Sequence, residues 1–250
     1  MRPAGALAAS LVAACLALAG CSSGSPTAGT SPSAASPAAG STSATPPSAV
    51  PTTASPTPAP APTSAPASRR PRPPRPERYV YPVQRCSSSY SSSHHDYPAS
   101  DIFTQKGCAF VAVTSGTVDE VSFTDRWNPQ VDAGATRGGR SVSIVGDDGV
   151  RYYGSHLLEI AAGIRPGVRV HAGQLLGLID NSGDARYTPT HVHFGLSWPT
   201  RHGLWWIRRG EVWPQRYLAA WRAGQNLSPR AEVLATERRL GREPPCQAEC

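Results

Sequence analysis

The feature that most restricts folding is a long segment, residues 22–68, which contains no charged residue and consists almost entirely of Ser, Thr, Ala, Pro and Gly. It has almost no apolar side chains to bury, so burial cannot offset the conformational entropy lost on folding. We therefore expect a disordered tether over residues 21–78, which ends in the basic, proline-rich residues 69–78. Folding is then confined to the residues after 78.

The N-terminus has the form of an export signal. Residues 1–20 contain one cation, Arg2, followed by an apolar stretch that is too short to span a membrane as a mature helix. The sequence Leu18-Ala19-Gly20-Cys21 resembles a bacterial lipobox, in which the leader is cut before the cysteine and the sulfur is acylated. We predict a lipoprotein signal peptide at residues 1–20, lipidation of Cys21 and a protein anchored to the outer face of the cell membrane. The alternative is an ordinary secretory signal with an incidental cysteine.

The formal net charge of +7 belongs mostly to the leader and the tether. From Tyr79 onward, 18 Arg and Lys face 16 Asp and Glu, which leaves a net charge of +2. So small a charge argues against a domain that binds phosphate backbones, and we expect no nucleic-acid partner. Outside the leader, no apolar run approaches the length of a transmembrane helix, which excludes a polytopic membrane protein.

Four of the six cysteines remain if Cys15 leaves with the leader and Cys21 is acylated. An even number of cysteines in an exported chain favours disulfides, and four cysteines allow three pairings. We favour Cys86–Cys108 and Cys246–Cys250. The alternatives are free thiols or a cysteine that binds metal.

Short alternating runs dominate the sequence after about residue 79 and predict an antiparallel β domain of the sandwich, roll or barrel type. Residues 141–145, the Asp148-Gly149 turn and residues 150–153 form a hairpin pattern. Helices are expected only near the end, at 214–223 and 231–240, where Tyr217, Leu218 and Trp221 share one helix face. Further strands are expected at 110–113, 117–118, 167–170, 175–179 and 191–197.

Two groups of histidines suggest chemistry. His191 and His193 alternate along a predicted strand, so both imidazoles project to one face, while Val192 and Phe194 would point outward. The alternative is a half-exposed strand with two polar residues facing solvent.

The second group combines imidazoles with a carboxylate. His94 and His95 precede Asp101, and nitrogen and carboxylate ligands are the set that zinc prefers. Taken alone, this segment is a weak signal, and the alternative is a surface turn with an Asx-type cap. His156 follows the predicted hairpin, where a single histidine is more often structural.

The order of these motifs resembles the lysostaphin/LytM-type zinc metallopeptidases, which cut the peptide part of bacterial peptidoglycan. The resemblance covers about residues 94–198 and implies that family's all-β fold. The blocks that carry it, besides His94 and His95, are Asp101-Ile102-Phe103, Gly107-Cys108-Ala109-Phe110-Val111-Ala112, Gly116-Thr117-Val118, Asp148-Gly149, Tyr153-Gly154-Ser155-His156-Leu157, Val170-His171-Ala172-Gly173-Gln174-Leu175-Leu176-Gly177 and Thr190-His191-Val192-His193-Phe194.

Carried over residue by residue, the resemblance implies His94, Asp101 and His193 as zinc ligands and His156 and His191 as catalytic histidines. The family's first motif, His-x-Gly-x-Asp, has three residues between its ligands. This chain has six between His94 and Asp101, or five if His95 is the ligand. The choice between His94 and His95 stays open, with His94 preferred.

The resemblance thus implies a zinc endopeptidase domain at residues 79–225 that acts on peptidoglycan, with a C-terminal extension at 226–250. Zinc-bound water would supply the nucleophile, and His156 and His191 would act in proton transfer and oxyanion stabilisation. One alternative is a non-catalytic relative that binds the wall or regulates another hydrolase. Another is a purely structural tethered lipoprotein.

Overall fold

The computed structural model describes residues 77–248 and Cys250. The predicted signal peptide, the lipidation site Cys21 and nearly all of the predicted tether lie outside the described residues. Within the described part, no helix is long and apolar enough to cross a membrane.

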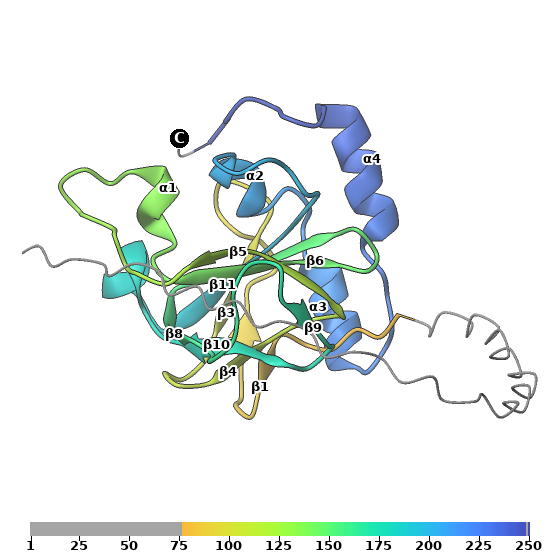
Figure 1. Cartoon of the computed structure of the whole chain (residues 1–250), viewed down its shortest axis with the longest axis horizontal. Coiled ribbons are helices and arrows are strands. Elements are labelled where there is room, and N and C mark those ends of the chain that lie inside the picture. The colour runs from red at the N-terminus through yellow and green to blue at the C-terminus, as the bar shows by residue number, and fades with distance from the viewer. Residues whose placement is uncertain (1–76, 249) are drawn as a thin grey trace, which may run out of the picture. The chain divides into compact units, whose positions relative to one another are not determined.

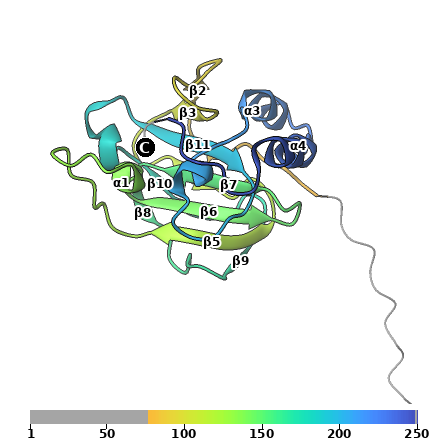
Figure 2. The same cartoon turned by 90° about the horizontal axis from the view of Figure 1, so that it is seen from above.

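Two antiparallel sheets form the domain (Figure 1), which confirms the predicted fold class. The first contains seven strands in the order β2-β3-β11-β7-β6-β5-β9, and the second contains four in the order β1-β4-β10-β8. Figure 2 shows β11, β7, β6 and β5 side by side. The strands are β1 Val83–Gln84, β2 Ser89–Tyr90, β3 Ser100–Phe103, β4 Ala109–Val111, β5 Gly116–Ser122, β6 Ser141–Gly146, β7 Arg151–Ser155, β8 Leu157–Ile160, β9 Arg169–Val170, β10 Leu175–Ile179 and β11 His191–Ser197.

The predicted hairpin is confirmed as β6 and β7, which pair with Val145 opposite Arg151. Alternation identified these strands because each places apolar side chains in the core at every second position. The short strands β1, β2 and β8 carry no such pattern and were not predicted. β8 begins directly after His156, so this histidine lies between two strands of different sheets.

The apolar core lies between the sheets. Gly154 on β7 permits this packing, because a Cβ there would overlap the ring of Phe110 on β4. Val192 and Phe194 on β11 are both fully buried in this core. The expectation that they point outward was wrong, because the second sheet covers the face of β11 opposite the histidines.

Both predicted helices are present, as α3 Gln215–Arg222 and α4 Arg230–Leu240, at one end of the sheets in both views (Figures 1 and 2). Tyr217, Leu218 and Trp221 are buried, as their shared helix face predicted. The Tyr217 hydroxyl donates to Glu232 at 2.6 Å, so α4 packs against α3. Three short elements were not predicted: α1 Gly134–Arg137, η1 Gly183–Tyr187 and α2 Trp205–Arg208.

Both predicted disulfides are present. Cys86–Cys108 links the segment after β1 to the start of β4, and Cys246–Cys250 closes a small loop after α4. The four cysteines are therefore neither free thiols nor metal ligands.

Glu211 lies in a segment that runs along β11, with its backbone N–H bonded to the Leu196 carbonyl at 2.8 Å. Burial raises the pKa of its carboxyl from 4.5 to about 7, although the charges of Arg209 and Arg239 oppose this rise. Because the folded-state pKa is the higher one, the contribution of Glu211 to stability is complete below pH 4.5 and is lost as the pH rises through 7.

We therefore expect Glu211→Gln to raise the free energy of unfolding by about 1 kcal/mol at pH 8, because it removes the buried charge. This value is smaller than the pKa shift alone would give, since solvent screens a partly exposed group. At pH 4.5 the substitution should change the free energy of unfolding little. Urea unfolding at both pH values measures this difference. Glu159→Gln, at an exposed position on β8, is the matched control and should show no such pH dependence. An equal effect of Glu211→Gln at both pH values would contradict the prediction.

Candidate metal and catalytic site

Three neighbouring strands bring the predicted site residues together. In the sheet register, His193 on β11 lies opposite Asp101 on β3 and opposite Ser155 on β7. His191 lies two residues earlier on β11, on the same face of the strand. Strand pairing therefore places Asp101 beside both histidines, although about 90 residues separate them in the chain.

Three imidazoles surround the carboxylate of Asp101. His193 Nδ1 lies 3.1 Å and His191 Nε2 lies 3.8 Å from Oδ1, while His94 Nε2 lies 3.8 Å from Oδ2. All three histidines are buried. Burial alone would raise the pKa of Asp101, but the nearby imidazoles, with that of His193 the closest, lower it well below its usual range.

The geometry favours His94 over His95 as the first ligand. The His94 side chain is only 3% exposed, whereas that of His95 is 61% exposed and its Nδ1 lies 2.5 Å from Asp96. His95 is nevertheless within reach, since His94, His95 and Asp101 have ligand atoms within 4.8 Å of one another. The rings of His94 and His95 stack with their centroids 4.0 Å apart. Both rings therefore lie near the carboxylate, although more residues separate them from Asp101 than in the family's motif.

The proton position on His193 tests whether a metal fits here. Its Nε2 lies 2.9 Å from the carbonyl oxygen of Arg209, and a carbonyl can only accept, so Nε2 carries a proton. In the neutral ring, Nδ1 then presents a lone pair to the Asp101 carboxylate. These two acceptors repel unless the ring is doubly protonated or a cation binds both.

The distances also suit a metal. Ligands at 2.0–2.2 Å from a tetrahedral zinc lie about 3.4 Å from one another. The separations of 3.1 and 3.8 Å from Asp101 to His193 and His94 bracket this value. Two imidazoles and one carboxylate are also the donor types that zinc prefers, so His94, Asp101 and His193 fit zinc by chemistry and by their contacts with Asp101. Among the described residues, the ligand atoms that all lie within 4.8 Å of one another are those of His94, His95 and Asp101.

A glycine lets the Arg209 carbonyl reach His193. A Cβ on Gly195 would overlap this carbonyl, so we expect Gly195→Ala to push it away from Nε2 of His193. Overpacking of this kind costs about 1–3 kcal/mol. Loss of a group that orients a ligating histidine lowers metal affinity by about 10–100-fold.

Urea unfolding and zinc competition measure the two effects of Gly195→Ala. Gly163→Ala is the control, because a Cβ there contacts nothing and meets only the strain of a positive φ of 82°. It should lose stability but keep its zinc affinity. Equal zinc affinities in the two variants would show that the Arg209 carbonyl does not orient His193.

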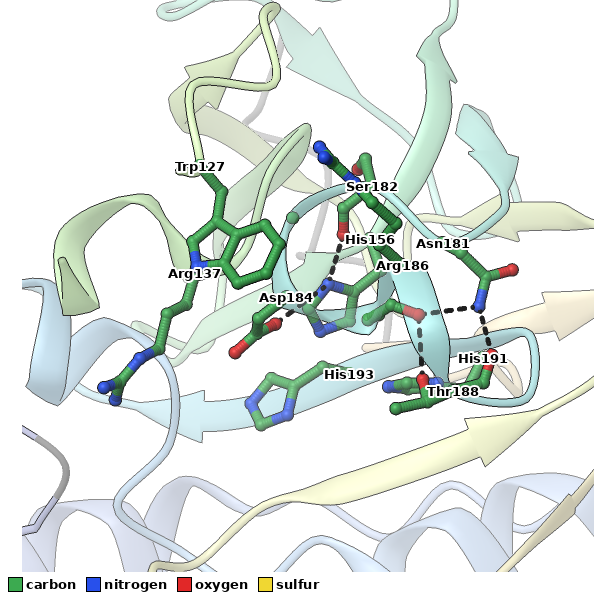
Figure 3. Close-up of polar contacts among 12 residues, drawn as sticks. Trp127, Arg137, His156, Asn181, Ser182, Asp184, Arg186, Thr188, His191 and His193 are labelled. Carbon is green, nitrogen blue, oxygen red and sulfur yellow. Dashed lines mark hydrogen bonds and ion pairs between the residues drawn. The ribbon is translucent and has the colours of Figure 1, made fainter. Parts of the chain in front are cut away.

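His156 and His191 are held in the same protonation form. Nδ1 of His156 lies 2.8 Å from the Ser182 carbonyl oxygen (Figure 3). Nδ1 of His191 lies 2.8 Å from the carbonyl oxygen of Pro189. Both Nδ1 atoms therefore donate, which leaves Nε2 as the acceptor nitrogen of each ring.

Burial, assisted by the charges of His191 and His193, lowers the pKa of His156 to about 3. Burial also lowers the pKa of His191, although Asp101 opposes this change. Both rings are therefore neutral at pH 7 and able to accept a proton. Their centroids lie 4.9 Å apart.

An open groove runs over these histidines, and its rim contains residues that the sequence analysis missed. Trp127 precedes α1, Arg137 is the last residue of α1, and Asp184 lies in η1 (Figure 3). Asp132 connects Trp127 and Arg137, since it accepts from Trp127 Nε1 at 2.9 Å and from Arg137 at 2.9 Å. No periodicity or motif marks residues in such short segments.

Fold and site together define a class of protein, an antiparallel β domain with a buried histidine–carboxylate centre suited to a metal ion. Residues 95–203 match the model of peptidase family M23. His94 lies one residue before the matched range. No curated protein matches the chain.

Solved structures with detectable similarity include the catalytic domain of the antimicrobial peptidase lysostaphin from Staphylococcus simulans. It is 20% identical, with 53% of this chain and 92% of that chain covered and a TM-score of 0.41. A proposed glycyl-glycine endopeptidase LytM from Ruminococcus gnavus is 21% identical, with 60% of this chain and 62% of that chain covered and a TM-score of 0.46. Helicobacter pylori Csd3 is 20% identical, with 66% and 39% covered and a TM-score of 0.38.

Proposed function

We propose that this chain is a zinc-dependent endopeptidase that hydrolyses peptide cross-links, or stem and bridge peptides, of bacterial peptidoglycan. One observation carries the proposal. In a domain that matches the model of a peptidase family, the Asp101 carboxylate lies within 3.1–3.8 Å of ring nitrogens from His94, His191 and His193.

His94, Asp101 and His193 are the residues that would hold the metal. When bound, zinc polarises a carbonyl and lowers the pKa of a bound water from 15.7 to about 7. Two neutral imidazoles and one carboxylate leave a net positive charge on such a centre, and three protein ligands are typical of catalytic zinc sites.

His156 and His191 supply the proton chemistry in this proposal. Each ring is neutral, with its Nδ1–H bonded to a backbone carbonyl, so Nε2 can take a proton from water and later release it to the leaving amine. One histidine performs this transfer. The other can stabilise the oxyanion that forms at the scissile carbonyl only after it binds a proton at Nε2, because its Nδ1–H is held by a backbone carbonyl.

A peptidoglycan substrate requires the domain to lie outside the cell membrane. We infer that the lipid anchor at Cys21 holds the protein on the outer face of the membrane, and that residues 21–78 let the domain reach the wall. The lipobox-like sequence before Cys21 supports this, and so do the two disulfides, which persist in oxidising compartments.

The test is zinc content together with hydrolysis of purified peptidoglycan by the full chain. One zinc per chain and new free amino groups, both removed by a chelator, are the expected results. Zinc without cleavage of any wall type would overturn the endopeptidase and favour the wall-binding or regulatory alternative. A protein that binds no zinc would overturn the proposal as a whole.

A further inference from the structure

The residues after α4 return to the catalytic side of the domain. The C-terminal segment, residues 242–248 with Cys250, runs past α2 (Figure 1). Two indoles donate to its carbonyls, Trp198 Nε1 to Arg242 at 2.8 Å and Trp206 Nε1 to Pro244 at 2.9 Å. The guanidinium of Arg209 donates to a third carbonyl, that of Ala248.

The third of these donors also contacts the metal site. The carbonyl oxygen of Arg209 accepts from His193 Nε2 at 2.9 Å. Its guanidinium lies 3.7 Å from the ring centroid of Tyr97. The Tyr97 ring in turn lies 4.6 Å from the ring of His94 and 5.8 Å from that of His193. Arg209 therefore links the C-terminal segment to both predicted histidine ligands.

Packing leaves Arg209 little freedom. Only 9% of the residue is exposed, and its guanidinium also lies 5.1 Å from the ring of Trp205. The next residue, Gly210, approaches the Pro98 carbonyl so closely that a Cβ would overlap it. The disulfide Cys246–Cys250 encloses Ala248, so it restricts the carbonyl that the guanidinium contacts.

We propose that Arg209 is a positioning residue for the metal site and that the disulfide-closed C-terminal segment holds Arg209 in place. The guanidinium fixes the Tyr97 ring beside His94, and the backbone carbonyl fixes the protonation form and ring orientation of His193. Groups that orient a ligating histidine usually affect metal affinity by about 10–100-fold. The inference rests on the proposed function only in naming zinc as the ligand.

The first experiment compares the full chain with Arg209→Ala. Zinc competition should show an affinity about 10–100-fold lower in the variant. In the metal-free wild type, ¹⁵N chemical shifts of His193 should show that Nε2 always carries a proton, and in the variant this proton should be shared between Nε2 and Nδ1. Arg209→Lys keeps the charge but not the planar stack on Tyr97, so it should recover part of both losses.

A second variant separates the C-terminal segment from Arg209 itself. Cys246→Ser with Cys250→Ser opens the small loop but leaves Arg209 unchanged, so it should lower zinc affinity in the same direction, by a smaller factor. Arg222→Ala is the matched control, because this arginine also stacks on a tyrosine, Tyr81, at 4.4 Å but is not among the residues that line the groove. It should bind zinc as the wild type does.

Wild-type zinc affinity and an unchanged His193 spectrum in both Arg209→Ala and the serine variant would overturn the inference. Failure of the proposed function gives a different result, namely a wild type that binds zinc but cleaves no peptidoglycan. If the wild type bound no zinc, the spectra of the metal-free proteins would still decide whether the C-terminal segment and Arg209 set the protonation form of His193.

Discussion

His193→Ala will bind zinc at least about 100-fold more weakly than the wild type and will release no amino groups from peptidoglycan. The change removes a proposed ligand, so its effect should exceed the 10–100-fold typical of groups that only support a ligand. It also leaves the buried carbonyl of Arg209 without its donor, at a cost of about 1–3 kcal/mol. Zinc competition, amine release and urea unfolding measure the three effects.

The control for this variant is His202→Ala. The His202 side chain is 79% exposed, and His202 does not line the groove. It should keep the zinc affinity and activity of the wild type. Zinc binding by His193→Ala at wild-type strength would show that the ligands have been assigned wrongly, with His95 the next candidate beside His94 and Asp101.

His156→Asn and His191→Asn will keep zinc but lose hydrolysis by about 10²–10⁴-fold each, the usual contribution of a positioned proton-transfer group. Neither histidine belongs to the proposed ligand set, and each presents an acceptor nitrogen that asparagine cannot replace as a base. Zinc competition and the rate of amine release separate binding from chemistry. The double variant should lose little more than the worse single one, because the two groups act together in one reaction.

Asparagine is the appropriate replacement because His156 has a φ of 66°, a conformation that asparagine adopts more readily than alanine. His171→Asn, at an exposed position far from β11 in the sheet order, is the control for the chemical change itself. Loss of zinc in His191→Asn would reassign this residue as a ligand, which its 3.8 Å distance from Asp101 permits. Full activity in either variant would remove that histidine from the proposed mechanism.

The sequence by itself determined the local pattern of the domain. The alternation of side chains located β6, β7, β10 and β11, because successive side chains of a strand point to opposite faces and only one face meets the apolar core. The same period placed His191 and His193 on one face. The helix period placed Tyr217, Leu218 and Trp221 on the buried face of α3, and an even set of cysteines after the tether indicated two disulfides.

Only the tertiary structure decided how these pieces meet. The register between β3 and β11, which sets Asp101 opposite His193, depends on a pairing across about 90 residues that no local pattern encodes. The nitrogen that each histidine offers depends on backbone carbonyls, such as that of Arg209, and every residue has a carbonyl whatever its side chain. The rim residue Asp184 lies in the short helix η1, whose position depends on packing and which carries no periodic pattern. Periodic elements can therefore be predicted from the sequence, whereas long-range strand pairing and backbone contacts depend on the folded chain as a whole.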